Sequence, residues 1–244
     1  MALSRGIVAT VLKRLKMYVL RSKVQIADVS DAVVLIGVSG AGAAHALAPV
    51  SSSLPKGTHD HVPLAGGGCL IAMSGERFLL ALASDAAPGI WKALAVALRP
   101  VGTPCWEWLD IRAGMPLVTE ETQEQLLPQM ANLELIGGVS FKKGCFPGQE
   151  VVARTQHLGK VKRRMFLARV DNGAGVVPGP GDDIFSDDIP GQASGMVVNA
   201  QPAPEGGYDM LAVVHLSSRD GATVHLRSAD GPVLRFLDLP YSVS

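Results

Sequence analysis

Residues 142–150 read Lys-Lys-Gly-Cys-Phe-Pro-Gly-Gln-Glu. The stretch places one cysteine, Cys145, on a turn, because Gly144 and the pair Pro147-Gly148 favour a bent backbone. Lysines beside a cysteine favour the thiolate over the thiol. A lone cysteine is as often a buried, unreactive side chain, but the glycines and charges of this stretch argue against burial. The pattern therefore predicts a functional loop whose working group is Cys145.

The composition bounds the size and the class of the protein. The chain has 244 residues, of which 48% are hydrophobic and 18% charged, enough for one large or two modest domains. No apolar run approaches the roughly 20 residues that span a bilayer, so we expect no membrane segment. Three widely spaced cysteines, Cys69, Cys105 and Cys145, suit a reducing compartment, and we expect a cytoplasmic protein. They form no Cys-x-x-Cys pair, so the sequence predicts no metal site.

Charge is balanced overall, with 22 basic and 22 acidic residues, but it is unevenly spread. Residues 1–27 contain six basic residues and no acid, and residues 141–164 contain seven basic residues against Glu150 alone. Such segments serve an anionic ligand, a nucleic acid or only solubility. Few aromatic residues are available for stacking on bases near 142–164. The sequence carries no nucleic-acid motif either, so we expect no direct nucleic-acid binding.

The first two-thirds of the sequence mixes helical and strand patterns. Apolar residues at helical spacing predict a core-packing helix over 7–21, and Val24–Ala27 alternates like a short strand. The apolar run Val33–Val38 predicts a buried strand before a Gly-rich turn, and this turn lacks the spacing of a phosphate loop. The other predicted elements are a hairpin at 69–73 and 77–82 and helices at 42–48, 89–98 and 104–112. Without a regular β-α-β period, this is an α+β region.

From about residue 165 the sequence changes character. Short apolar runs alternate with Gly, Pro and Asp turns, which predicts a small antiparallel sheet or barrel without helices. The predicted strands lie at 165–170, 194–198, 210–216, 222–227 and 233–237. The Gly/Pro/Asp-rich residues 171–191 are expected to be loops. We therefore predict an α+β region over 1–164 and a C-terminal β-barrel domain over 165–244.

Residues 143–150 resemble the K-G-C-[FY]-x-G-Q-E signature of the YgfZ family. Its members are folate-binding proteins related to the aminomethyltransferase, or T-protein, of the glycine cleavage system. Four further blocks of the chain are similar to that family, and residues 106–164 carry the most specific part of the resemblance. The blocks are Leu109-Asp-Ile-Arg-Ala-Gly-Met-Pro116, Pro128-Gln-Met-Ala-Asn-Leu133, Gly137-Gly-Val-Ser-Phe-Lys142 and Val151-Val-Ala-Arg-Thr155.

The resemblance implies a fold and a function. The implied fold has two interleaved T-protein-like α+β domains around a folate site, followed by a small antiparallel β-barrel. The implied role is that of an accessory protein, rather than an enzyme, that supports iron–sulfur cluster assembly or repair in client enzymes, including radical enzymes that modify tRNA. The implied cofactor is tetrahydrofolate or a derivative. We expect transient binding of iron–sulfur client proteins and a monomer.

The family pattern also implies which residues form the site. Cys145 matches the signature cysteine and, together with Lys143, is the expected reactive group. Trp106 falls where the family has a tryptophan that contacts folate, and an indole suits a flat pterin. The other residues expected at the folate site are Arg112, Gly144, Gly148, Gln149 and Glu150.

Two features depart from the family pattern. Phe146-Pro147 replaces the commoner Tyr-Thr, and several dozen residues that usually precede the helix near Ile7 are not in the chain. In the family those residues supply opening strands, a second folate-facing tryptophan and the region of the T-protein's catalytic aspartate. We therefore expect a fragment, a misassigned start or a shortened member, with a folate pocket open on one side. The alternative function, a tetrahydrofolate-dependent aminomethyltransferase, is disfavoured because it needs such a carboxylate.

Overall fold

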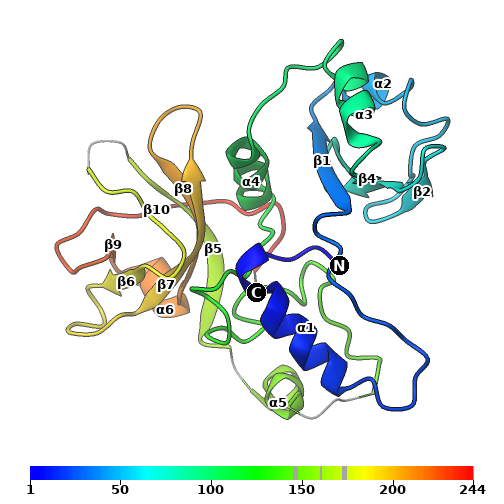
Figure 1. Ribbon diagram of the computed structural model, residues 1–244. Helices are drawn as coiled ribbons and strands as arrows, with labels where there is room; N and C mark the ends of the chain where they lie inside the picture. The colour runs from blue at the N-terminus through cyan, green and yellow to red at the C-terminus, as the bar shows by residue number, and fades with distance from the viewer. Residues whose placement is uncertain (145–147, 160, 172–174, 244) are drawn as a thin grey trace. The chain divides into compact units, whose positions relative to one another are not determined.

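The computed structural model describes residues 1–144, 148–159, 161–171 and 175–243. The chain forms two compact units, one made of Met1–Val11 with Thr103–Ser244 and the other of Leu12–Gly102. Each unit contains helices and one antiparallel sheet (Figure 1), which confirms the predicted α+β class.

The unit Leu12–Gly102 is built on a four-stranded antiparallel sheet in the order β1-β4-β3-β2. Its strands and helices are β1 (Val33–Ser39), α2 (Ala43–Ala46), β2 (His61–Pro63), β3 (Cys69–Met73), β4 (Arg77–Ala83) and α3 (Ala87–Leu94). The strand predicted at 33–38 forms, but its buried residues are Ile36 and Val38, whereas Leu35 is 48% exposed, so the expected burial of the whole strand is wrong. The hairpin β3–β4 and the helices at 42–48 and 89–98 are confirmed, with shorter helices. Residues of α2 and α3 pack with Ile36, Leu70 and Leu80 in one core cluster. The helices therefore cover one face of this sheet.

The N-terminal elements differ from two expectations. After a 3-10 turn at Arg5–Ile7, the predicted helix forms as α1 (Val8–Met17), but none of its residues is buried, so the expected core packing is wrong. Residues 24–27 form no strand, and Val24 is 55% exposed. Alternation alone does not make a strand, because a strand also needs a neighbour to complete its hydrogen bonds. Among the described residues, no helix is long and apolar enough to cross a membrane.

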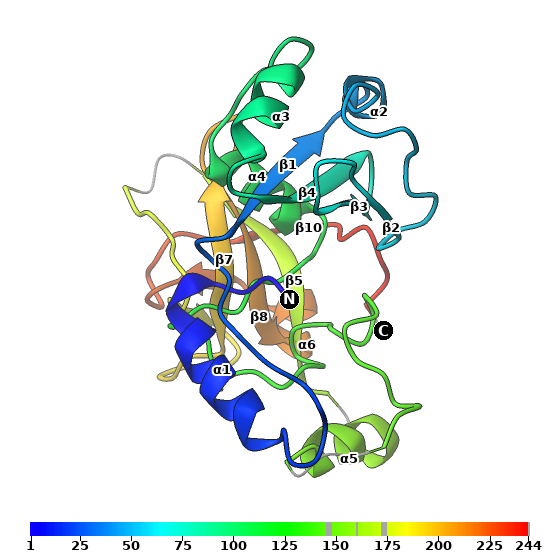
Figure 2. The same ribbon diagram turned by 45° about the vertical axis from the view of Figure 1, so that its right-hand side comes forward.

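The sheet of the other unit has six strands in the order β10-β5-β8-β7-β6-β9 and curls into a half-barrel (Figures 1 and 2). Its elements are β5 (Arg163–Val170), β6 (Asp183–Ser186), β7 (Gly195–Pro202), β8 (Tyr208–His215), α6 (Leu216–Gly221), β9 (Val224–Leu226) and β10 (Arg235–Leu237). The five predicted strands are present. Strand β6 lies within the expected loop 171–191, and α6 lies where no helix was expected, so both of these predictions were wrong. The boundary predicted at 164/165 falls inside β5.

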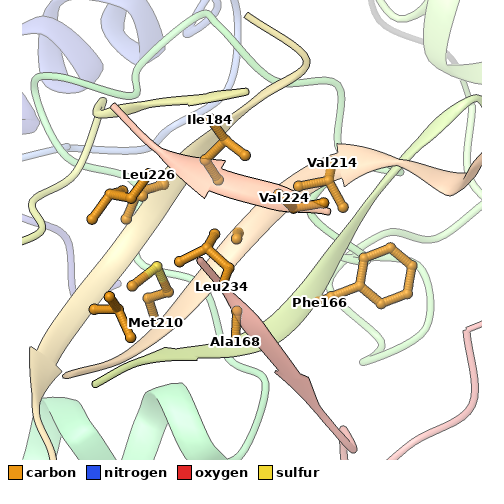
Figure 3. Packing of buried hydrophobic residues seen from close by; sticks show 11 residues of the cluster. Phe166, Ala168, Ile184, Met210, Val214, Val224, Leu226 and Leu234 are labelled. Carbon is orange, nitrogen blue, oxygen red and sulfur yellow. The ribbon is translucent and has the colours of Figure 1, made fainter. Parts of the chain in front are cut away.

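Both faces of the half-barrel are buried. Along β5, Phe166 and Ala168 belong to the cluster inside the curl (Figure 3), whereas Met165 and Leu167 belong to a second cluster on the outer face. Successive side chains of a strand point to opposite faces, so an almost uninterrupted apolar sequence is required here. The outer cluster includes Ile111 of α4 (Thr103–Arg112), which therefore packs on the sheet.

Helix α4 ends as the Gly/Pro pattern of its sequence predicts. The Gly114 N–H donates to the Ile111 carbonyl at 3.0 Å, and the Met115 N–H donates to the Asp110 carbonyl at 2.9 Å. This pair of bonds is the Schellman arrangement, which needs a left-handed residue, and Gly114 has φ +66°. The Tyr241 hydroxyl donates to the Gly114 carbonyl at 2.8 Å. The end of α4 is thus fixed to the C-terminal segment.

Replacing Gly114 by Ala is expected to destabilise the protein by about 1–3 kcal/mol. A Cβ at this position would lie 2.6 Å from Cε1 of Tyr241 and 2.8 Å from Cδ2 of Leu239, and the positive φ adds backbone strain. Urea unfolding measures the loss. Gly221→Ala is the matched control, since a Cβ there meets nothing within 4 Å. Equal stability of the two variants would contradict this account of the turn.

Candidate functional site

Helix α4 carries two of the predicted folate-site residues, and one side of it is anchored to the half-barrel. The Trp108 Nε1–H donates to Oδ2 of Asp209 on β8 at 2.9 Å, and Nε2 of Gln201 on β7 donates to Glu107. Ile111 is 1% exposed in the outer core cluster. These three anchors lie within little more than one helical turn. They fix both the position and the rotation of α4.

Asp209 is the centre of the anchoring contacts. The residue is 1% exposed, and its carboxylate lies 3.6 Å from Nη1 of Arg112 and 3.8 Å from Nε of Arg169. Arg169 is in turn held by the Gly206 carbonyl, to which its Nη2 donates at 2.7 Å. A buried carboxylate is tolerated only with such charged and hydrogen-bonding partners. The Asp209 carboxylate thereby ties α4 to β5 and β8.

Trp106 lies on the side of α4 that faces away from these anchors. Successive residues of an α-helix are rotated by about 100°, which separates Trp106 from the anchored side formed by Glu107, Trp108 and Ile111. Its indole is half-buried. The anchors on one side of α4 therefore determine which way the helix presents Trp106 on the other side.

Charge near α4 is mixed. Arg112 is placed beside Trp108, and its side chain remains 42% exposed although it is paired with Asp209. Burial, with a smaller contribution from the nearby Asp110 carboxylate, raises the pKa of Glu107. The hydrogen bond from Gln201 keeps this carboxyl oriented along the sheet side of the helix. Arg112 is thus the cationic group of α4 that solvent can reach.

A hydrogen bond connects the two ends of residues 143–149, which we call the signature loop. The Lys143 ammonium donates to Oε1 of Gln149 at 3.0 Å, a hydrogen bond between two residues six positions apart in the sequence. Gly148 has φ +87°, a conformation that favours glycine. Cys145, the predicted reactive residue, lies outside the described residues. Gly144 and Glu150 are exposed, and Glu150 is the first residue of α5 (Glu150–Leu158).

A buried polar chain positions α5, and with it the end of the loop. The Gln129 side chain, which is 0% exposed, donates from Nε2 to the Val152 carbonyl of α5 at 2.7 Å. The Gln129 carbonyl accepts from Nη1 of Arg164 on β5 at 2.8 Å, and Arg164 also pairs with Glu134. The loop is therefore connected to the half-barrel through residues of one of the predicted family blocks.

The predicted site residues that the structure describes lie in two places, the signature loop and helix α4. Lys143 and Gln149 meet in the signature loop, next to Gly148 and Glu150. Trp106 and Arg112 share α4 but are displayed in different directions. Sequence analysis missed Trp108, Asp209 and Gln129, which hold these groups in place. One signal was available, because Asp209 is an acid within the otherwise apolar run of β8.

No metal centre accompanies these groups in the part of the chain that the structure describes. Within residues 1–144, 148–159, 161–171 and 175–243, no three His, Cys, Asp or Glu side chains are arranged to hold a metal ion.

Comparison with known proteins finds relatives over nearly the whole chain. A tRNA-modifying protein YgfZ of Pectobacterium atrosepticum is 33% identical over 235 residues, which are 96% of this chain and 70% of that protein. The tRNA-modifying protein YgfZ of Yersinia enterocolitica is 33% identical over 243 residues, 98% of this chain and 72% of that protein. No sequence profile of a protein family matches the chain.

Proposed function

Because the chain belongs to the YgfZ family, we propose that it is a folate-binding accessory protein that supports tRNA modification. In this role it maintains or repairs iron–sulfur clusters in the enzymes that modify tRNA. The observation that carries the proposal is the similarity of 96–98% of the chain to proteins named tRNA-modifying protein YgfZ. The clasped loop around Cys145 and the fixed helix α4 support it.

Two described groups suit tetrahydrofolate. The half-buried Trp106 indole offers a flat apolar surface on which a pterin ring stacks. The exposed edge of the Arg112 guanidinium suits the carboxylates of the glutamate tail, since arginine binds carboxylates with paired hydrogen bonds. When bound, tetrahydrofolate supplies a carrier for one-carbon units. The contribution of this chain is to bind and orient it.

Cys145 supplies the reactive thiol of the proposal. Lys142 and Lys143 precede it in the sequence, and positive charge near a cysteine favours the thiolate. A thiolate acts as a nucleophile, a redox group or a ligand to iron. Iron–sulfur clusters are normally held by four protein ligands, so one cysteine contacts a cluster only while the client protein supplies the other ligands. The proposed contact of Cys145 with a cluster is therefore transient, and the client protein supplies the other ligands.

Titration with tetrahydrofolate tests the binding part of the proposal. Trp91 lies on α3 and is 43% exposed, so Trp91→Phe is used as the background to remove its fluorescence. In that background we expect saturable quenching, and Trp106→Ala is expected to weaken binding at least about tenfold, or about 1.4 kcal/mol. Val177→Ala is the control, since Val177 is 63% exposed and lies outside α4. Unchanged affinity of Trp106→Ala would contradict the proposed stacking.

Two further outcomes separate the proposal from its alternative. Restoration of tRNA modification in cells that lack their own family member supports the accessory role. Formation of methylene-tetrahydrofolate from a lipoyl-bound aminomethyl donor would instead identify an aminomethyltransferase, and the proposal would then be wrong.

A further inference from the structure

We propose that one face of α5 is the docking surface for the client protein, and that it fits a partner surface with an apolar centre and an acidic rim. The inference rests on the proposed function, because it names the surface through which the accessory role is exerted. The face is formed by Val151, Arg154 and Leu158, and we refer to it as the α5 face.

The α5 face exposes apolar side chains in a helix that is otherwise held in place. Val151 is 57% exposed and Leu158 is 84% exposed, and Arg154 is also exposed. Residues three, four and seven positions apart lie on the same side of an α-helix. The three residues therefore form one stripe, in which Arg154 lies between two aliphatic residues. Both views draw α5 clear of the half-barrel strands (Figures 1 and 2).

The opposite side of α5 faces the protein. Val152 and Ala153 are half-buried, and the Val152 carbonyl accepts the hydrogen bond from Gln129. The contact fixes which side of α5 is turned outward. Val151 and Leu158 lie on the other side of the helix and are exposed.

The end of the helix keeps Leu158 in the outer turn. The Gly159 N–H donates to the carbonyls of Arg154 and Thr155 at 3.1 and 3.2 Å. A Cβ at residue 159 would lie 2.9 Å from the Thr155 Cα, so only glycine closes the helix at this point. Leu158 is 84% exposed in this last turn.

Charge around the α5 face indicates an acidic partner. Residues 141–164 contain seven basic residues, and Glu150 is the only acid among them. Of the described ones, Lys142, Lys143, Arg154 and Lys162 are exposed. Complementary charge at the rim of an interface steers association and selects partners. An acidic rim on the client would therefore match this segment.

The aliphatic groups favour a protein over RNA. Single-stranded nucleic acid is bound by aromatic side chains on which bases stack, whereas Val151 and Leu158 have no π surface. The described aromatic ring beside α5, Phe141, already packs edge-on against His157, with centroids 6.1 Å apart. An aliphatic pair around an arginine is typical of a protein interface, where apolar groups are covered and arginine is enriched. We therefore assign the α5 face to a protein partner.

The α5 face follows the segment that contains Cys145 directly in the sequence, so a client bound there would lie next to that segment along the chain. Helix α5 begins at Glu150, directly after the residues that the Lys143–Gln149 hydrogen bond clasps. Cys145 belongs to the stretch between these two residues. A client held by α5 would therefore be bound through the element that follows the reactive loop.

The experiment measures binding of the full chain to a purified radical iron–sulfur enzyme that modifies tRNA, by biolayer interferometry. We expect Leu158→Asp and Arg154→Glu each to weaken binding about tenfold or more. Val177→Asp is the matched control, since Val177 is 63% exposed and lies outside the basic segment. It is expected to bind like the unmodified chain. A circular dichroism melt confirms that each variant is folded.

Unchanged enzyme binding by Leu158→Asp, or no enzyme binding by the unmodified chain, would overturn the assignment. It would also be wrong if Leu158→Asp and Arg154→Glu kept binding to the enzyme but lost binding to tRNA. The proposed function is tested by a different measurement. It would be wrong if the unmodified chain did not restore tRNA modification in cells. Cys145→Ala separates the two further, because it is expected to keep enzyme binding while losing the restored modification.

Discussion

Replacing Asp209 by Ala is expected to lower the free energy of unfolding by about 3 kcal/mol, as removal of one member of a buried ion pair does. The substitution leaves the Trp108 Nε1–H without its acceptor. It also leaves Arg169, whose side chain is 12% exposed, without the carboxylate 3.8 Å away. Arg112 contributes less, since its side chain is 42% exposed. Urea unfolding followed by circular dichroism measures the loss.

Two control variants locate the origin of this effect. Asp209→Asn keeps an oxygen acceptor for Trp108 and is expected to lose less stability than Asp209→Ala. Glu205→Ala removes the other partner of Arg169, but Glu205 is 77% exposed, so we expect a change below about 1 kcal/mol. If Asp209→Ala cost as little as Glu205→Ala, α4 would be held by apolar contacts such as those of Ile111, and the anchoring role of Asp209 would be wrong.

Replacing Cys145 by Ala is expected to abolish the support of tRNA modification without unfolding the protein. The thiolate is the nucleophile or iron ligand of the proposed role, and the methyl group of alanine has neither property. The measurement is mass spectrometry of tRNA nucleosides from cells that lack their own family member and express the variant. We expect the amount of the modified nucleosides to fall to that of the empty vector.

The matched control is Cys69→Ala, which changes a half-buried cysteine on β3, in the other compact unit. It is expected to restore modification as well as the unmodified chain does. Full restoration by Cys145→Ala would show that the thiol has no part in the function, even if folate binding and the α5 face were confirmed.

Periodicity predicted the strands of the half-barrel well, because each one is apolar and bounded by turn residues. Strand β6 escaped prediction since it holds only Asp183–Ser186 between glycines and prolines, and its pairing with β7 and β9 supplies what its sequence lacks. Helix α5 was not predicted from the sequence, for a related reason. It contains the β-branched residues Val151, Val152 and Thr155 and has no side-chain cap at Gln149. Tertiary contacts such as the Gln129 hydrogen bond stabilise it instead.

The site was predictable only where a local motif marked it. The glycines and lysines of the signature loop are neighbours in the sequence, and the Lys143–Gln149 hydrogen bond spans only six positions. Trp108 and Asp209 are 101 positions apart, so no local pattern indicates that they meet. The two tryptophans of α4 look alike in the sequence, yet the Asp209 contact makes one of them an anchor and turns the other away from the sheet.

Restoration of tRNA modification by the unmodified chain tests the central claim most directly. The chain is expressed in bacteria whose own YgfZ gene is deleted, and the modified tRNA nucleosides are quantified with the native gene and the empty vector as references. We expect the chain to raise these nucleosides well above the level of the empty vector. A folded, expressed chain that leaves them at the level of the empty vector would contradict the account.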